Sequence, residues 1–402
     1  MGAMTYRLMP GFAADASASE DELAADEADA MAEPTRASKV VFSSTLEAPL
    51  SWANSNSTFM SGALASPGVM RALVLGGNRY IGLHLVFELA RRGFDVTVMN
   101  SHVAPLPEGA RRLHGDRRQA GVLREVLDPH RDEFEIVYDN TAYQVEDLVP
   151  LVELFRGRVQ QFVFTSSVAV YRRSFVQPVR EHYARHAPDD PDPRKAYGVG
   201  KVNCEDYLAH LHRTEGFPAT SLRVTHTVGP KTPLASREPV FFARLEQGRP
   251  ILVPGEGFPF VHLAHVQDVA RLMVAVAGNE QALGEQYNVG GAEITSILGC
   301  VRLMARAVGV EADVVHVPLD IARRARPPLV HWGESLVGGA MFSTDKALAH
   351  LDWEPSFGLE AAYRDSYEWF DAEGRDRFEF DFSGDDAVLA ELARRRSSLT
   401  DR

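Results

Sequence analysis

Tyr197 and Lys201 stand four residues apart in the segment Tyr197-Gly198-Val199-Gly200-Lys201. On a helix, side chains at this spacing lie on one face, one turn apart. A lysine ammonium beside a tyrosine favours the phenolate and so lowers the pKa of the tyrosine toward the working pH. Such a tyrosine can exchange a proton with a hydroxyl while hydride moves to or from a nicotinamide. Because the chain has only five lysines, a chance Tyr-x-x-x-Lys is rare.

Two serines, Ser166 and Ser167, directly follow the apolar run 162–165. A hydroxyl at the carboxyl end of a buried strand is placed to hydrogen-bond a substrate carbonyl. Gly198 and Gly200 would keep the helix surface thin where a cofactor passes. The sequence therefore predicts a catalytic group of Ser167, Tyr197 and Lys201, with Ser166 as an additional substrate contact.

A glycine-rich turn connects the apolar run 71–75 to a helical stretch at 83–92, and the next strand-like run covers 95–99. This order within about 30 residues is typical of the dinucleotide-binding βαβ unit. Glycine lets the backbone turn tightly and approach the pyrophosphate, which binds free N–H groups at a helix N-terminus. The predicted cofactor-binding residues are Gly76, Gly77, Arg79, Tyr80, Ile81, Gly82, Asn100, Asp116 and Lys201.

The elements that must position these residues alternate between strand and helix. Further strands are expected at 136–140, 162–165 and 219–224, and further helices at 145–155 and 201–213. Such alternation predicts an α/β fold with a Rossmann-type, doubly wound parallel sheet, whose ligand lies beyond the carboxyl ends of the strands. The motifs above fall at those ends.

Composition narrows the class of protein. The 402 residues carry 42 Lys+Arg and 55 Asp+Glu, a formal net charge of −13, which disfavours nucleic acid as the main partner. No run of about 18 apolar residues is present, so no membrane span is expected. Two cysteines exclude a disulfide scaffold and suit the cytoplasm. Residues 1–69 hold nine acidic and three basic residues with little periodicity, which predicts a disordered acidic tail.

In these motifs the chain resembles the extended short-chain dehydrogenases/reductases, also called the NAD-dependent epimerase/dehydratase family. The resemblance runs from Met70 to about Trp369 and implies that Ser167 orients the substrate oxygen and that Tyr197 is the acid/base. It implies that Lys201 tunes Tyr197 and holds the nicotinamide ribose, that Asp116 faces the adenine, and that the chain forms a homodimer. Further segments that carry it are Gly115-Asp116, Arg223…Gly229-Pro230, His265-Val266-Gln267-Asp268, Tyr287-Asn288-Val289-Gly290-Gly291 and Asp345-Lys346-Ala347.

The family's fold implies a division of the chain. The nucleotide domain would comprise 70–230, with 262–291 returning to it. A smaller C-terminal α/β substrate domain would comprise 231–261 and 292–375, and 376–402 would form an appendage. Within the appendage, the alternation in 378–382 predicts an edge strand, and 383–386 predicts a capping box for a helix over 387–395. Trp353 and Trp369, with Tyr363 and Tyr367, are expected to close the core under the C-terminal helix.

Arg79 stands where many members of the family have glycine. With the following Tyr-Ile-Gly it resembles a branch that includes chloroplast stem-loop RNA-binding proteins. The acidic residue expected about 20 residues after the glycine turn, which would bind a ribose 2′-OH, is Asn100. A neutral Asn100 near Arg79 tolerates a 2′-phosphate, so NAD and NADP both remain open. Alternatively, Arg79 packs over the adenine or pairs with an acid.

Two further departures concern the reaction. Val168-Ala169 occupy the positions of an Asp-Glu pair found in sugar 4,6-dehydratases, which disfavours water elimination. The arginine that many relatives use on a sugar-nucleotide diphosphate is missing from 257–262. The candidate replacements are Lys231, Arg237 and Arg244. For each of them, a charge exposed to solvent at the surface is the simpler explanation.

Histidines offer one further candidate. His226 replaces a residue that faces substrate in the family, and its imidazole is a possible second acid/base, although a structural role is the simpler explanation. His262 and His265 have no evident third ligand, so no metal site is expected.

The sequence thus predicts an NAD(P)-dependent oxidoreductase of the epimerase type that acts on a sugar or nucleotide sugar. One alternative is an NADPH-dependent ketoreductase on a natural-product-like substrate. Another, of a different class, is a non-catalytic or RNA-binding relative. The expected partner is a small-molecule substrate, without nucleic acid or membrane.

Overall fold

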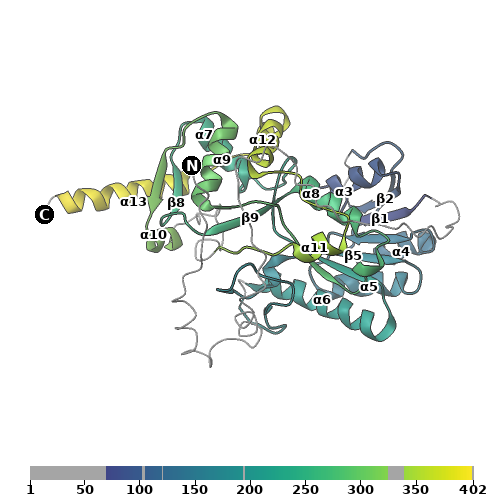
Figure 1. Cartoon of the computed structure of the whole chain (residues 1–402). Helices are drawn as coiled ribbons and strands as arrows, with labels where there is room; N and C mark the ends of the chain where they lie inside the picture. Colours follow the sequence, from purple (N-terminus) through teal and green to yellow (C-terminus); the bar gives the residue numbers. More distant parts are fainter. Residues whose placement is uncertain (1–68, 102–104, 120, 193–194, 325–338, 401–402) are drawn as a thin grey trace, which may run out of the picture. The chain divides into compact units, whose positions relative to one another are not determined.

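A computed structural model describes residues 69–101, 105–119, 121–192, 195–324 and 339–400 (Figure 1). The predicted acidic tail lies outside these residues, apart from Val69. The account below concerns the described residues of one compact unit, 69–181 and 185–400. No helix in the described ranges is long and apolar enough to cross a membrane.

Seven strands form a single parallel sheet, as the alternating pattern predicts. Their order is β10-β6-β5-β4-β1-β2-β3, so the connection changes direction between β1 and β4, where ligands bind in open α/β sheets. The strand β1 is apolar almost throughout because both faces of the sheet are covered. The strands are β1 (Arg71–Leu75), β2 (Asp95–Asn100), β3 (Arg111–His114), β4 (Ile136–Asp139), β5 (Gln161–Ser167), β6 (Ala219–Val224) and β10 (Gln286–Val289).

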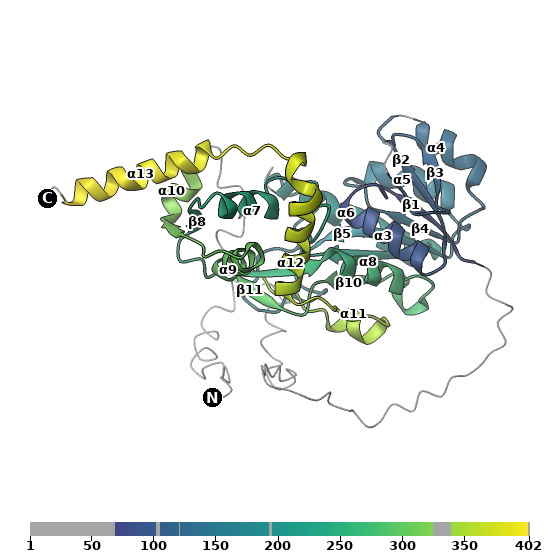
Figure 2. The same cartoon turned by 90° about the horizontal axis from the view of Figure 1, so that it is seen from above.

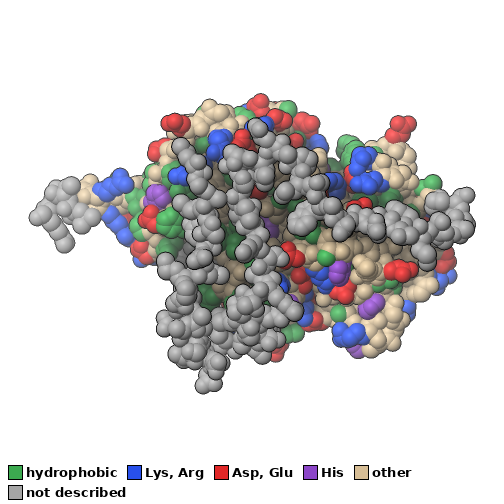
Figure 3. Space-filling view, in the orientation of Figure 1, with side chains coloured by type: hydrophobic (Ala, Val, Ile, Leu, Met, Phe, Trp, Pro, Cys, Tyr) green, Lys and Arg blue, Asp and Glu red, His purple; other side chains and the backbone are tan. Residues whose placement is uncertain are grey.

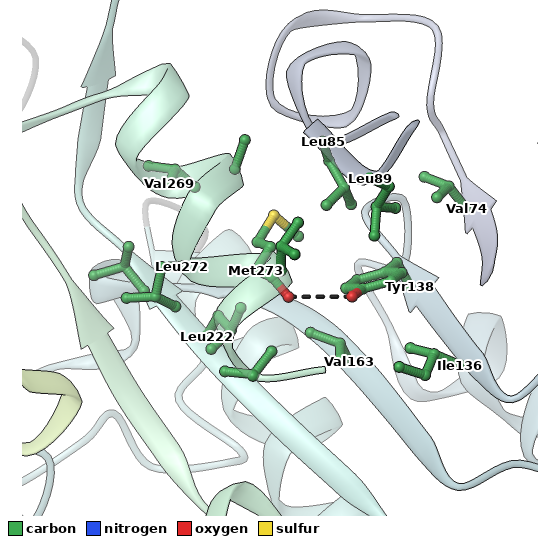
Figure 4. Packing of buried hydrophobic residues seen from close by; sticks show 14 of the residues in the cluster. Val74, Leu85, Leu89, Ile136, Tyr138, Val163, Leu222, Val269, Leu272 and Met273 are labelled. Atoms are coloured by element: carbon green, nitrogen blue, oxygen red, sulfur yellow. Dashed lines mark hydrogen bonds between the residues drawn. The ribbon is translucent and has the colours of Figure 1, made fainter. Parts of the chain in front are cut away.

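Helices cover both faces of this sheet. On one face, α3 (Tyr80–Arg91) packs against α8 (Val266–Ala275), and their apolar side chains meet those of the strands (Figure 4). Within this layer the buried Tyr138 hydroxyl donates to the Met273 carbonyl at 3.2 Å. The other face is covered by α4 (Val122–Leu127), α5 (Val145–Phe155) and α6 (Ala196–Glu215).

A second region is built around two small sheets and a helical layer, seen together in Figure 2. One sheet has the order β11-β9-β7 and the other pairs β12 with β8. Its elements are β7 (His226–Val228), α7 (Glu238–Glu246), β8 (Ile251–Pro254), β9 (Phe260–His265), β11 (Ile294–Ser296), α9 (Ile297–Val308), β12 (Val314–Val317), α10 (Leu319–Arg324) and α12 (Leu359–Trp369).

The predicted boundary between the regions needs one correction. The helix α11 (Asp345–His350) and Trp353 pack with the nucleotide-domain core and not with the substrate region. The Trp353 indole N–H donates to the Asp268 carbonyl of α8 at 3.0 Å, which accounts for this placement. Trp369 and Tyr363, by contrast, lie in the core of the second region as expected.

The C-terminal appendage also differs from its prediction. Residues 378–382 pair with no strand among the described residues, because their three phenylalanine rings pack on each other and on the second region. The last helix, α13 (Ser383–Thr400), starts four residues earlier than expected. In place of the predicted capping box, the Asp381 carboxylate accepts from the Ser383 N–H at 2.9 Å.

Arg244 is not a solvated surface charge. Its side chain is buried on α7, and it forms an ion pair with Asp385 of α13 at 2.5 Å. The Arg244 guanidinium also stacks over Phe382. These contacts attach the appendage to the second region, so Arg244 is used in packing.

Candidate functional site

The glycine turn after β1 has the backbone geometry that an anion site requires. Gly76 has a positive φ of 78°, and a Cβ there would stand 2.3 Å from the Thr141 side chain. A Cβ on Gly82 would stand 2.1 Å from the Gly76 carbonyl oxygen. The helix α3 begins after Arg79 with no side-chain cap and no acidic residue in its first turn. Its first N–H groups are therefore suited to a pyrophosphate.

The residues that flank this turn also fit a dinucleotide. Asn100, at the end of β2, is buried, and neither polar atom of its side-chain amide has a hydrogen-bond partner among the described residues. Leaving such a group unsatisfied costs about 1–3 kcal/mol, which a ligand hydroxyl would relieve. Arg79 is exposed. Asp116 forms an ion pair with Arg118 at 2.7 Å in the turn after β3.

Lys201 is the most firmly held of the predicted catalytic residues. It is buried on α6, and its Nζ donates to the carbonyls of Ala142 at 2.8 Å and Thr165 at 2.7 Å. These bonds use two of the three donors of an ammonium. Its Nζ also lies 5.9 Å from the centre of the Tyr197 ring. Burial lowers the pKa of Lys201 to about 8.

Tyr197 lies one turn before Lys201 on the same helix and is half exposed. Its hydroxyl lies near enough to the Ser167 side chain for that group to lower its pKa, so the structure brings these two predicted residues together. Burial raises the pKa of Tyr197, and the nearby Ser167 side chain only partly offsets this. The direction is opposite to the one expected from Lys201, because desolvation of the phenolate dominates, and the cation that lowers this pKa is Arg237.

The two serines have different surroundings. Ser167 ends β5 beside Val224 of β6, is partly exposed and accepts from the Ala169 N–H at 3.2 Å. Ser166 is buried and donates its hydroxyl proton to Glu205 at 2.6 Å. The expectation that Ser166 contacts substrate is therefore wrong, because its side chain points into the framework of the protein.

The two glycines of the Tyr-x-x-x-Lys segment are required by packing. A Cβ on Gly198 would stand 2.1 Å from the Ala169 carbonyl oxygen, and one on Gly200 would stand 2.4 Å from the Tyr143 carbonyl oxygen. Because these glycines have no side chains, α6 can approach the segments that contain Ala169 and Tyr143. The expected reason for the two glycines was different, namely room for a passing cofactor.

His226 is the first residue of β7 and lies two residues after the end of β6, the strand that pairs with Ser167. Its imidazole is half exposed, and Nε2 is 3.8 Å from the buried carboxylate of Glu238. Arg237, another predicted candidate, donates to the Thr227 carbonyl at 3.1 Å. Lys231 pairs with Glu373 at the surface, as a solvated charge would. No group of three possible metal-ligating side chains occurs in the described ranges.

Two buried ion pairs beside α6 were missed by the sequence reasoning. Glu205 pairs with Arg223 of β6 at 2.8 Å, and Asp139 of β4 pairs with Arg117 at 2.6 Å. The spacing could have indicated Glu205, because it follows Lys201 by one further turn on the same face. No local signal indicates that Asp139 and Arg117 meet, since Asp139 ends β4 and Arg117 lies 22 residues earlier, in the connection that follows β3.

The fold, the glycine turn and the Tyr-Lys pair together define a class. The chain belongs to the NAD-dependent epimerase/dehydratase family, whose model matches residues 72–290. The family depends on NAD, in agreement with the dinucleotide-binding geometry after β1.

Among curated proteins, the chain is similar to the chloroplast stem-loop binding protein of 41 kDa b of Arabidopsis thaliana, with 29% identity over 344 residues, 80% of this chain and 84% of the relative. It is 26% identical to the UDP-glucose 4-epimerase of Erwinia amylovora over 351 residues, 75% of this chain and 97% of the relative.

Solved structures share the fold. The epimerase Mth375 of Methanothermobacter thermautotrophicus superposes with a TM-score of 0.64 at 22% identity, covering 78% of this chain and 96% of the other. The UDP-glucuronic acid 4-epimerase of Bacillus cereus, solved with NAD, superposes with a TM-score of 0.61 at 19% identity. The match covers 76% of this chain and 98% of the other.

Proposed function

We propose that this protein is a nicotinamide-dependent epimerase-type oxidoreductase that acts on a hydroxyl-bearing carbon of a sugar or nucleotide sugar. The observation that carries the proposal is the anchoring of Lys201 by the Ala142 and Thr165 carbonyls, one helical turn from Tyr197 on α6. These groups lie at the carboxyl edge of the sheet, where the glycine turn would hold the dinucleotide. The curated UDP-glucose 4-epimerase supports the same class of reaction.

Each residue has a distinct role in this proposal. Ser167 orients the substrate oxygen, and Tyr197 exchanges the proton of that oxygen through its hydroxyl. Lys201 places a positive charge one turn from the phenol, which stabilises the phenolate as the proton leaves. The first turn of α3 and Asn100 would hold the dinucleotide, which supplies hydride acceptance and donation when bound. His226, with the Glu238 carboxylate behind it, is a further candidate for contact with substrate.

The nucleotide carried by the purified protein tests this proposal and separates it from the ketoreductase alternative. The protein is denatured and the released nucleotide is identified by chromatography. The native protein is then incubated with UDP-glucose and UDP-glucuronic acid, and the C4 epimers are quantified. Retained NAD with epimer formation supports an epimerase. Empty protein that binds NADPH and reduces ketones supports the reductase, and no nicotinamide binding at all contradicts both.

Cofactor preference depends on Arg79 and Asn100. Because Asn100 carries no charge and Arg79 is exposed at the start of α3, we propose that the site accepts a 2′-phosphate. The change Arg79→Ala is expected to weaken NADP binding about tenfold, the size of one hydrogen bond to a charged group, and to leave NAD binding unchanged. Fluorescence titration measures both affinities. The control is Arg92→Ala, which removes an exposed arginine paired with Glu88 after the other end of α3. Equal losses for NAD and NADP would contradict this assignment.

A second candidate function is RNA binding, which the similarity to the chloroplast stem-loop binding protein favours. The charge distribution argues against it. Acidic and basic side chains are interspersed on the face seen in Figure 3, whereas nucleic-acid sites gather basic groups into a stripe. A gel-shift assay with a structured RNA at physiological salt decides the matter: a shift without any nicotinamide binding would favour the RNA-binding function.

A further inference from the structure

Lys201 is held in part by a turn that Asp139 shapes. Asp139 ends β4, and its Oδ1 accepts from the N–H groups of Thr141 at 2.9 Å and Ala142 at 3.0 Å. The Ala142 carbonyl in turn accepts from Lys201 Nζ at 2.8 Å. One carboxylate therefore fixes the backbone that presents a hydrogen-bond acceptor to the ammonium.

The same carboxylate is a buried charge. The Asp139 side chain has no exposed surface, and Oδ1 also accepts from Arg117 Nη1 at 2.6 Å. Arg117 is itself anchored, since it donates to the Thr141 hydroxyl at 2.5 Å and the Asp147 carbonyl at 2.6 Å. Asp139 Oδ2 has no hydrogen-bond partner among the described residues. Because the surroundings have a low dielectric constant, this charge acts strongly on other buried groups.

We propose that Asp139 is a positioning residue for Lys201: it fixes the turn that binds the Lys201 ammonium and, as a buried anion, keeps that ammonium charged. The importance of this arrangement for turnover rests on the proposed function, in which Lys201 stabilises the Tyr197 phenolate. Asp139 acts through Lys201 and is not itself assigned a contact with substrate.

The charges around Lys201 determine the sign of the expected effect. Burial lowers the pKa of Lys201 to about 8, and Asp139 is the first of the groups that oppose this change. Cys204 and Glu205, on α6 itself, act in the same direction as Asp139. Arg117 acts against them. Neutralising Asp139 therefore removes a stabilising anion and leaves Arg117 unbalanced, so both consequences lower the pKa of Lys201 further. The aromatic rings nearest to Nζ are those of Phe164, Tyr143 and Tyr197.

Asp139→Asn in the otherwise unchanged protein tests the proposal, because asparagine keeps an acceptor oxygen for the turn and removes the negative charge. The chain has five lysines, so their ¹³Cε signals can be resolved by NMR, and Lys201→Arg identifies the relevant one. The wild-type signal is expected to titrate near pH 8. In the variant, its midpoint is expected to fall by about one pH unit or more.

The matched control is Asp268→Asn. Asp268 is a buried carboxylate of the same domain that pairs with Arg271 at 2.6 Å and accepts from two backbone N–H groups, yet it belongs to the other face of the sheet. The Asp268→Asn substitution is expected to lower the free energy of unfolding without moving the midpoint of the Lys201 titration.

Arg117→Gln provides an independent arm should Asp139→Asn fail to fold. It removes the opposing cation, so the Lys201 midpoint is expected to rise. An unchanged midpoint in folded Asp139→Asn, or an unchanged or lowered one in Arg117→Gln, would overturn the proposal. The readout needs no substrate, so it is independent of the proposed function: a shifted midpoint together with full turnover of Tyr197→Phe would refute only the latter.

Discussion

Replacing Tyr197 by phenylalanine is expected to lower turnover by a factor of about 10²–10⁴, the usual contribution of a positioned general acid or base. The phenylalanine ring keeps the packing against Tyr143, whose ring centre lies 6.1 Å away, and loses only the hydroxyl. Dinucleotide affinity, measured by fluorescence titration, should therefore remain as in the wild type. The loss should appear in kcat, measured on the substrate that the wild type converts.

Tyr207→Phe is the matched control, because Tyr207 is a partly buried tyrosine on the same helix. It should retain full turnover. Unchanged turnover in Tyr197→Phe would show that the proton is handled elsewhere, and His226 would then be the first group to examine.

The structure determines the direction in which proton exchange through Tyr197 is expected to depend on pH. Burial raises the pKa of Tyr197, so the protonated phenol is its resting form around neutral pH. Lys201 is charged below its pKa of about 8 and neutral above it. In the proposed reaction, stabilisation of the phenolate by Lys201 is therefore expected below about pH 8 and is expected to be lost as the pH rises through that value.

The second large effect is expected for Glu205→Gln, which should lower the free energy of unfolding by about 3–5 kcal/mol. Glu205 accepts from Arg223 at 2.8 Å, from Arg185 at 3.1 Å and from the Ser166 hydroxyl at 2.6 Å, and its side chain is 1% exposed. Glutamine would leave Arg223 buried without a countercharge. Urea unfolding followed by circular dichroism measures the loss.

The comparison is Glu153→Gln, which breaks an exposed ion pair with Arg124. Because solvent screens exposed pairs, its unfolding midpoint should change little. Similar midpoints for the two variants would mean that the Glu205–Arg223 pair contributes no more than a surface contact.

The sequence alone was sufficient to predict the class of fold, and it predicted a helix for Tyr197 and Lys201 and a strand before Ser167, as the structure has them. Local patterns in the sequence indicate strands such as β1 and β6, because their hydrophobic residues lie within a short run. The spacing of Tyr197 and Lys201 is local as well, since it spans a single helical turn. The predicted parallel sheet and family are confirmed. The glycine turn could be assigned because its backbone geometry requires glycine at particular positions, among them Gly76 and Gly82.

Only the tertiary structure decided which neighbours surround a given side chain. Ser166 and Ser167 are neighbours in sequence, yet the alternation of side chains along a strand buries one against Glu205 and leaves the other partly exposed. Similarly, alternating phenylalanines in 378–382 resemble a strand, but in the part of the chain that the structure describes no strand pairs with them.

The pairing of Asp139 with Arg117 and the direction of the Tyr197 pKa both depend on burial and on contacts between distant segments. Local sequence describes the period of a helix or strand. It does not specify the desolvation of a charge, because desolvation is produced by every element that packs around it.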